Sequence, residues 1–440
     1  MTGLGLKSLV KNSATTLGRQ VLAGFIQLIT FAIIARVFGP EGNGQYAVAL
    51  LLPIFLVTFL NMGVGPANVY HLGAGKVGML TVLRVSMSLW LIITILGMLV
   101  GAAVIRFYAE LFFPGIDAKL LWLSLIAFPV CLLQDFIISV FQGVQRFSEF
   151  NFVLLVQPLV SLIMIVIGVL AGAQEVEYVI ISYIAGVFSA IIVSLYFLTV
   201  KKVDCTELQD QDDAGYSRSA INYGYKSNLS NILAYINYKA DIFLVNYLLG
   251  ASAAGIYIVA VHIVERLWLL SQSVSTILLP RLSQLNSDEK KRKQMTPIIC
   301  RWVLTLTLMS GVLLGMLSYP LIGMLFGDSY LGAVMPLLFL LPGILAGSGA
   351  RILANDIAAR GRPELNMYTA WVVVIVNIAG NLILIPSYGL VGAATATSLS
   401  YTLNLFLKLY IYSYFTDHKW SNLLLIKNDD FRMILMLAKR

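Results

Sequence analysis

Residues 85–104 read VSMSLWLIITILGMLVGAAV, a run of twenty residues without an ionisable side chain. Because an α-helix rises about 1.5 Å per residue, such a run is long enough to cross the roughly 30 Å hydrocarbon core of a bilayer. It is also too long and too continuous for the alternating strands of a membrane barrel, which have about ten residues each. The stretch therefore predicts a membrane-spanning helix.

The composition of the whole chain supports this reading. Of the 440 residues, 59% are hydrophobic and 12% are charged, and the mean hydropathy is +0.84. Soluble domains carry about 25% charged residues, so much of the surface here must face hydrocarbon. The formal charge of +8 would suggest a nucleic-acid partner in a soluble protein. In this chain we assign it to the membrane surface and expect no nucleic acid.

Twelve apolar runs along the chain predict an all-α integral membrane protein with twelve transmembrane helices. The seventh and eighth runs are the most polar. The predicted spans cover roughly residues 20–38, 46–70, 80–104, 118–142, 151–172, 178–200, 222–249, 253–279, 300–326, 331–357, 365–386 and 389–415.

The basic residues provide an independent test of this topology. Most Lys and Arg side chains fall on one side of the predicted membrane, whereas the other side receives Arg36, Arg106 and Lys119. Cytoplasmic loops carry the excess of Lys and Arg, so both termini are predicted to be cytoplasmic. This requires an even number of spans, and twelve satisfies the requirement.

An internal repeat divides the chain into halves. Gly39, Gly44, Tyr46 and Ala49 recur 211 residues later as Gly250, Gly255, Tyr257 and Ala260. An even number of spans separates the copies, so the halves share one orientation and form two parallel-repeat six-helix bundles around a central cavity. We predict an N-terminal bundle over 1–205, a cytoplasmic linker over 206–221, a C-terminal bundle over 222–415, and a cytoplasmic tail over 416–440 that is either amphipathic or partly disordered.

The sequence carries no convincing catalytic motif. Gly75-Lys76 lacks the remaining positions of a phosphate-binding loop, and Asp210-Gln211-Asp212 lies in a loop too short for a glycosyltransferase domain. The scattered Cys131, Cys205 and Cys300 have neither disulfide-framework nor zinc-site spacing. We therefore expect a protein that is not an enzyme and that needs no cofactor or metal.

Ionisable side chains inside the spans are the most informative residues, because each costs a few kcal/mol in hydrocarbon and normally faces a wet interior. The acids are predicted either to couple transport to an ion or proton or to be counter-ions of the bases; they are Asp241 and Glu265. The predicted substrate-binding residues that line the cavity are Arg36, Lys239, Arg266, Arg351, Asn228, Asn231, Tyr235 and Asn355. Arg36 has the alternative of reaching to the headgroups from a helix end.

The charge of this predicted lining indicates the class of substrate. Bases outnumber acids, which favours an anionic ligand. The amides and phenols between them suit sugar hydroxyls, which need directional donors and acceptors beside an aromatic face.

Three motifs resemble those of the bacterial polysaccharide transporters, or O-antigen flippases, of the superfamily that also contains the multidrug and toxic compound extruders. They are ARVFGPEGNGQY at 35–46, LFGDSY at 325–330 and PSYGLVGAA at 386–394. The resemblance extends over nearly the whole chain. Related peptidoglycan-precursor flippases typically have fourteen helices, whereas twelve are predicted here.

The resemblance implies a V-shaped pair of bundles in the bacterial inner membrane that alternates between inward- and outward-open states. The implied substrate is a polyprenyl-pyrophosphate-linked oligosaccharide that is moved to the outer leaflet for O-antigen, capsule or exopolysaccharide synthesis. H⁺ or Na⁺ is a candidate coupling ion, and a polysaccharide polymerase is a candidate partner.

Two other functions remain open from the sequence. A multidrug exporter of the same architecture would expel lipophilic cations, and the surplus of bases argues against it. A membrane polymerase or ligase acting on the same lipid-linked glycan would usually carry a large external loop, and no such loop is found between the predicted spans.

Overall fold

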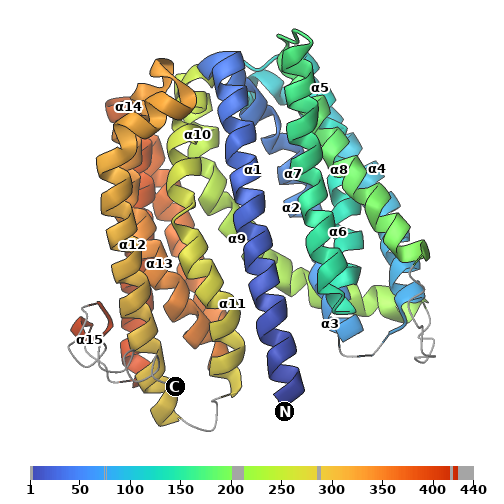
Figure 1. Ribbon diagram of the computed structural model, residues 1–440, viewed down its shortest axis with the longest axis vertical. Helices are drawn as coiled ribbons and strands as arrows, with labels where there is room; N and C mark the ends of the chain where they lie inside the picture. The colour runs from blue at the N-terminus through green and yellow to red at the C-terminus, as the bar shows by residue number, and fades with distance from the viewer. Residues whose placement is uncertain are drawn as a thin grey trace. The chain divides into compact units, whose positions relative to one another are not determined.

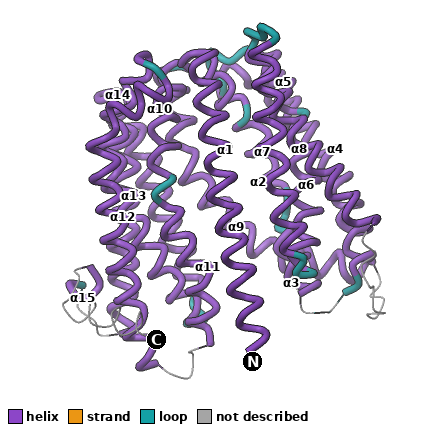
Figure 2. The backbone as a smooth tube through the Cα atoms, viewed as in Figure 1, coloured by secondary structure: helices purple, strands orange, loops and turns teal. Residues whose placement is uncertain are grey.

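The computed structural model describes residues 3–73, 75, 77–200, 213–284, 289–416 and 420–424. In these ranges the chain forms helices and loops without a β-strand (Figure 2). The elements are α1 (Gly3–Ala49), α2 (Leu51–Leu60), α3 (Val64–Gly73), α4 (Met79–Phe112), α5 (Ala118–Leu125), α6 (Ala127–Gly143), α7 (Phe147–Leu170), α8 (Val176–Val200), α9 (Asp213–Leu249), α10 (Ala251–Glu265), α11 (Trp268–Gln284), α12 (Glu289–Phe326), the 3₁₀-helix η1 (Asp328–Ala333), α13 (Val334–Ala359), α14 (Pro363–Thr416) and α15 (Ser421–Leu424) (Figure 1).

By length and composition, eight helical segments of the described chain can cross a membrane. The number becomes nine when Ala251–Glu265 and Trp268–Ser275, which meet at a bend of 46°, are counted as one broken span. The segments Gly18–Leu60 and Pro363–Thr416 have 43 and 54 residues, about twice a single crossing. Each contains a glycine with non-helical backbone angles, Gly39 or Gly389, where the helix direction can change. The protein is therefore a multi-pass helical membrane protein.

The chain divides into two compact units. The first contains Met1–Tyr235 and Asn246–Gly255, and the second contains Ile236–Val245 and Ile256–Arg440. In the first unit α7 packs against α1 and α8, and α6 packs against α3 and α4; in the second, α13 packs against α11, α12 and α14. Residues 206–212 of the predicted linker lie outside the described residues, as do 417–419 and 425–440 of the predicted tail.

Four turns of the first unit recur in the second half of the chain. At each of them one residue has a positive φ, at offsets that drift from 211 to 217 residues. The pairs are Gly39 and Gly250, Gly115 and Gly327, Gln145 and Gly361, and Gly172 and Gly389. Residues with a positive φ therefore recur in the same order along the chain.

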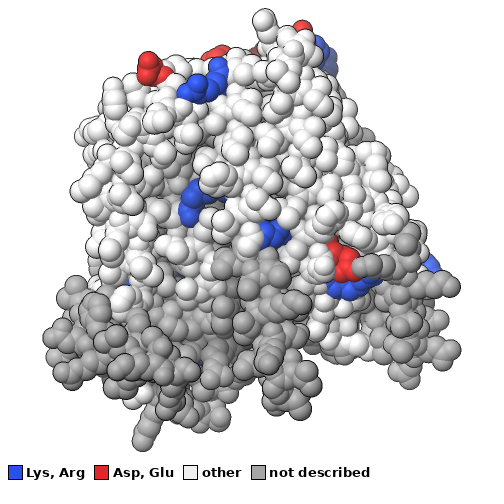
Figure 3. Space-filling view, viewed as in Figure 1, with Lys and Arg blue, Asp and Glu red and all other residues white. Residues whose placement is uncertain are grey.

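The surface of the helices is strongly apolar. Large side chains such as Leu99, Met316 and Ile383 are 66%, 76% and 69% exposed. On the part of the face in Figure 3 that is not drawn in grey, most of the surface is uncharged and the charged side chains are few. Exposed apolar side chains of this size and number fit hydrocarbon rather than water as the surrounding medium.

Candidate functional site

Asp241 on α9 is the centre of a buried polar cluster in the second unit. Its Oδ2 atom accepts hydrogen bonds from the Tyr257 hydroxyl on α10, at 2.9 Å, and from the Thr397 hydroxyl on α14, at 3.2 Å. The backbone N–H of Ile242 donates to Oδ1 at 2.8 Å. Asp241 is 3% exposed, and no ion pair to it is found in the described part of the chain. Three helices thus hold one carboxyl group away from lipid.

Two asparagines of α14 extend this cluster. The Asn377 amide donates to the Ser400 hydroxyl at 3.1 Å and to the Thr397 hydroxyl at 3.5 Å. Asn381 donates to the Asn377 carbonyl at 2.8 Å, and among the described residues its Oδ1 atom has no hydrogen-bond donor. The side chains of these two asparagines and of their hydroxyl partners Thr397 and Ser400 are all buried. An acid, hydroxyls and an unpaired amide oxygen are groups that can hold a proton or a hard cation.

The three predicted bases of the second unit have a different setting. Lys239 on α9 and Arg266 between α10 and α11 are half-buried, as is Arg351 on α13. Within the described ranges none of them makes an ion pair, and the Nε atom of Arg266 has no acceptor. Asn355, one turn beyond Arg351, has a buried amide nitrogen that also lacks an acceptor in that part of the structure. These side chains retain hydrogen-bond donors for a ligand.

Arg266 lies where a membrane-spanning helix is broken. α10 ends at Glu265 and α11 begins at Trp268, with the bend of 46° between them. Glu265 lies 4.0 Å from the Nδ1 atom of His262, one turn earlier on α10. Breaks in transporter helices expose backbone groups and commonly lie beside a binding site.

Arg351 is held against an aromatic group. Its guanidinium carbon lies 5.2 Å from the ring centre of Trp268, whose indole N–H donates to the Ile344 carbonyl at 3.1 Å. Tyr238 and Tyr401 contact the same indole, at ring-centre distances of 5.3 and 5.4 Å. The cation–π contact and the indole hydrogen bond restrict the orientation of Arg351.

Four of the predicted lining residues belong to the first unit: Arg36, Asn228, Asn231 and Tyr235. The Asn228 amide donates to the Thr58 carbonyl at 3.2 Å, and the Tyr235 ring packs edge-on against Phe55 at 5.3 Å. Both contacts attach α9 to α2. Arg36 is exposed on α1, and the side chain of Asn231 lies outside the described residues. The second unit therefore gathers most of the predicted site residues.

A neutral polar cluster in the first unit was not among the predicted site residues. The Asn68 amide on α3 donates to Ser86 at 3.0 Å and to Ser139 at 2.9 Å, and its Oδ1 atom accepts from the Tyr216 hydroxyl of α9 at 2.6 Å. His71, one turn later, lies 3.3 Å from the Ser219 hydroxyl. The beginning of α9 is thus fastened to α3 by side-chain hydrogen bonds.

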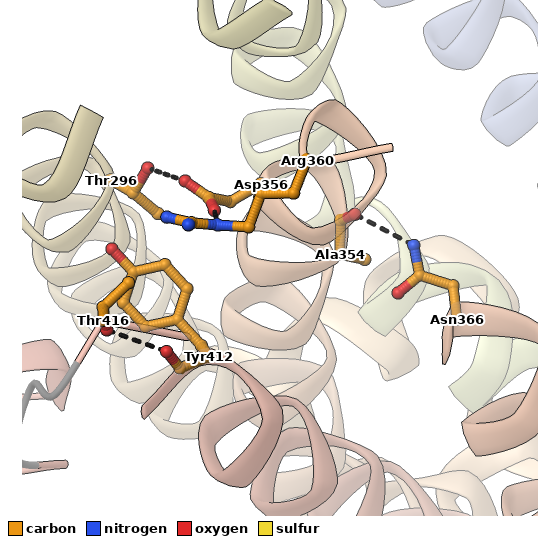
Figure 4. A network of polar contacts seen from close by, with 7 residues as sticks. All are labelled: Thr296, Ala354, Asp356, Arg360, Asn366, Tyr412 and Thr416. Atoms are coloured by element: carbon orange, nitrogen blue, oxygen red, sulfur yellow. Dashed lines mark hydrogen bonds and ion pairs between the residues drawn. The ribbon is translucent and has the colours of Figure 1, made fainter. Parts of the chain in front are cut away.

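A second set of polar contacts that the sequence did not reveal joins α12, α13 and α14 (Figure 4). Asp356 accepts from the Thr296 hydroxyl at 2.6 Å and forms an ion pair with Arg360. The Arg360 guanidinium carbon lies 5.7 Å from the ring centre of Tyr412. Asp356 is fully buried and its charge is balanced by Arg360. The cluster therefore connects helices of the second unit and carries no unbalanced charge that could bind a ligand.

Two solved transporter structures share the fold of this chain. A lipid II flippase MurJ in an inward closed conformation aligns with a TM-score of 0.75 at 17% identity, covering 96% of this chain and 91% of that one. An inward-facing multidrug resistance MATE family transporter of the MOP superfamily aligns with a TM-score of 0.74 at 13% identity, covering 89% and 94%. Both alignments show that this chain has the same fold as these two proteins.

The family follows from the sequence. A family model described as lipid II flippase MurJ matches residues 76–429, most of the chain. The chain belongs to this family, whose members are flippases and transporters rather than enzymes. The family predicted from the three motifs is confirmed.

Curated relatives agree with this assignment. A putative O-antigen transporter of Shigella flexneri is 21% identical over 92% of this chain and 98% of its own length. A probable low-salt glycan biosynthesis flippase, Agl15, of Haloferax volcanii is 28% identical over 46% of this chain and 44% of its own. The match thus spans less than half of the Haloferax protein and almost all of the Shigella one.

Proposed function

We propose that this protein flips polyprenyl-pyrophosphate-linked oligosaccharide repeat units across the bacterial inner membrane by alternating access, for O-antigen, capsule or exopolysaccharide synthesis. Twelve spans form two six-helix repeats of equal orientation, with both termini in the cytoplasm. The four turns that recur at offsets of 211 to 217 residues support the repeat. The division of the described chain into two compact units is consistent with it.

The observation that carries this proposal is the set of unpaired bases in the second unit. Lys239, Arg266 and Arg351 are half-buried in helices of a membrane protein. Unpaired cations at such positions are costly unless a ligand or water compensates them. A pyrophosphate supplies several anionic oxygens, and arginine binds them in a planar, two-pronged geometry. A lipophilic cation would be repelled by the same residues.

Asp241 is the coupling residue in this proposal. Asp241 makes no ion pair in the described part of the chain, so binding of a proton or a cation changes the net charge of its buried site and can bias a conformational equilibrium. Glu265, the other predicted coupling acid, is only half-buried and lies 4.0 Å from the Nδ1 atom of His262. The flux of H⁺ or Na⁺ through the Asp241 cluster would then drive the substrate.

The decisive experiment compares lipid extracts of a host that lacks the gene with extracts after its restoration. Loss of the flippase should let the lipid-linked repeat unit accumulate in the inner leaflet and reduce the surface glycan, and the wild-type gene should reverse both. Arg266→Ala and Arg351→Ala should fail to reverse them. Arg362→Ala, which removes an arginine with an exposed side chain in the same unit, is the matched control and should restore transport.

The same experiment tests the multidrug exporter as the competing function. Its fold is shared, so the fold does not distinguish the two. An unchanged lipid-linked pool, together with increased sensitivity of the deletion strain to lipophilic cations, would replace the flippase proposal with the exporter.

A further inference from the structure

Two arginines of α13 lie against aromatic rings and differ in their remaining contacts. The Arg360 guanidinium carbon lies 5.7 Å from the ring centre of Tyr412, and the same side chain forms an ion pair with Asp356. The Arg351 guanidinium carbon lies 5.2 Å from the ring centre of Trp268. Among the described residues, the Arg351 side chain makes neither an ion pair nor a hydrogen bond. At Arg351 the indole therefore takes the place that a carboxylate has at Arg360.

An aromatic partner leaves the hydrogen-bond donors of an arginine available. A cation–π contact attracts the positive charge as a whole and depends on no particular N–H group. A carboxylate such as that of Asp356 instead occupies N–H groups at the edge of the guanidinium, where a phosphate would bind in a two-pronged geometry. The contact with Trp268 thus restrains Arg351 and keeps its donors for a ligand.

The indole itself is fixed along one face of α13. Its N–H group donates to the carbonyl oxygen of Ile344 at 3.1 Å. Gly347, one turn later, leaves room for the ring, since a Cβ atom added there would lie 3.2 Å from the indole Cζ2 atom and 3.3 Å from its Nε1 atom. Arg351 follows after another turn. Positions 344, 347 and 351 share one face of the helix, and all three lie beside the same ring.

Two tyrosines from other helices contact the same indole. Tyr238 of α9 lies 5.3 Å from it and Tyr401 of α14 lies 5.4 Å from it, between ring centres, and the two phenol rings lie 6.3 Å apart. Trp268 and Tyr401 are each 6% exposed. Side chains of three helices therefore fix the orientation of the ring that faces Arg351.

Trp268 also adjoins a second base of the predicted site. It is the first residue of α11, directly after the break that follows α10, and Arg266 lies two residues before it. The ring that restrains Arg351 thus belongs to the segment that carries Arg266. We propose that Trp268 is a positioning residue, which holds Arg351 in place of a counter-ion and presents its free N–H groups to the pyrophosphate of the substrate. The pyrophosphate rests on the proposed function, whereas the restraint of Arg351 does not.

The first measurement reports on Arg351 without a substrate. Purified protein in detergent is treated with phenylglyoxal, which modifies guanidinium groups, and mass spectrometry gives the rate at the peptide that contains Arg351. Trp268→Leu should raise this rate about tenfold, because the cation–π contact is lost, and Trp268→Phe, which retains a weaker aromatic face, should raise it about threefold. Trp371→Leu is the matched control, at a tryptophan of the same unit that is 45% exposed, and should leave the rate unchanged.

A second variant displaces the indole and leaves its chemistry intact. The methyl group of Gly347→Ala would meet the ring at 3.2 Å, so the ring must move away from α13. Modification of Arg351 should then be about threefold faster, as in Trp268→Phe. Gly323→Ala is the control, because its added Cβ has no neighbour closer than 3.9 Å. Gly347→Ala keeps the test valid if Trp268→Leu does not fold, which thermal unfolding in detergent reports.

The second measurement is the affinity for inorganic pyrophosphate, obtained by titration calorimetry. Trp268→Leu should weaken binding about tenfold in the wild-type chain and less than about twofold in an Arg351→Ala chain, because a residue that acts through Arg351 has nothing to position once Arg351 is removed. A tryptophan that only stabilises the fold would lower both affinities by the same factor.

The outcomes separate the role of Trp268 from the proposed function. Folded Trp268→Leu and Gly347→Ala proteins in which Arg351 reacts at the wild-type rate would overturn the proposal, and so would equal losses of pyrophosphate affinity with and without Arg351. Faster reaction of Arg351 in a protein that binds no pyrophosphate and leaves the lipid-linked pool unchanged would refute the flippase and leave the restraint of Arg351 standing.

Discussion

The two units contain buried polar clusters of similar size and different chemistry. In the first unit Asn68 uses both amide hydrogens and its carbonyl oxygen on Ser86, Ser139 and Tyr216, so its hydrogen bonds close within a neutral group. In the second unit Asp241 brings an acid into a similar frame of hydroxyls and amides.

The difference separates a structural cluster from a functional one. A neutral cluster with its hydrogen bonds satisfied stabilises the fold and gains nothing from a further ligand. Asp241 makes no ion pair in the described part of the second unit, and the Asn381 amide oxygen, linked to it through Asn377 and Thr397, has no donor there; such a cluster gains from a proton or a cation. The first cluster should therefore respond to mutation in stability, and the second in transport.

The largest effect is expected for Asp241→Asn, which keeps the shape of the side chain and removes its charge. Burying the ionisable Asp241 costs a few kcal/mol. If the coupling it provides has a similar free energy, its loss should lower the rate of transport by about 100-fold. The thermal unfolding midpoint should stay close to that of the wild type. Clearance of the accumulated lipid-linked repeat unit gives the rate, and Asp328→Asn, at an exposed acid of the same unit, is the control. Transport at the control level would mean that Asp241 is structural like Asn68.

Asn68→Leu should have the opposite profile. The change leaves Tyr216, Ser86 and Ser139 buried without their partner, which should lower the free energy of unfolding by about 2 kcal/mol. Transport per folded molecule should persist. Unfolding in a denaturing detergent measures the first quantity, with Ser88→Ala on the exposed face of α4 as the control. A stable variant that does not transport would contradict the division between the clusters.

The sequence predicted the parts of this picture that depend on local pattern. Runs of apolar residues predicted a helical multi-pass protein, and motifs such as 35–46 placed the family, both of which are confirmed. The number of spans stays a prediction, because α9 is not among the segments that qualify by hydropathy and the segments Gly18–Leu60 and Pro363–Thr416 are long enough for more than one crossing. Hydropathy measures composition over a window and does not register a change of direction at a single glycine.

The partners of Asp241 were harder to predict, because they are distant in sequence and individually ordinary. Thr397 lies 156 positions from Asp241, and a threonine in an apolar helix usually bonds its own backbone. One usable signal was present: Asn377 and Asn381 stand one turn apart on the same face of an apolar helix. Two amides at this spacing require partners within the protein.

Thr397→Val sharpens the comparison within the second cluster. Valine has nearly the same shape and lacks the hydroxyl that donates to Asp241 at 3.2 Å. A hydrogen bond to a charged group contributes about 1.5 kcal/mol, so transport should fall about tenfold. Thr397→Ser, which restores the hydroxyl, should recover most of the rate, and a serine variant as slow as valine would assign the effect to packing.

The smallest effect is expected for Tyr216→Phe in the first cluster. The ring of Tyr216 packs edge-on against His71, with 5.5 Å between ring centres, and phenylalanine preserves this contact. Only the hydrogen bond to the Asn68 Oδ1 atom is lost, which should lower the free energy of unfolding by about 1 kcal/mol and leave transport unchanged. Tyr388→Phe, at a tyrosine that is 66% exposed, is the control. A loss of transport in the folded Tyr216→Phe protein would show that the attachment of α9 to α3 takes part in transport and is not only structural.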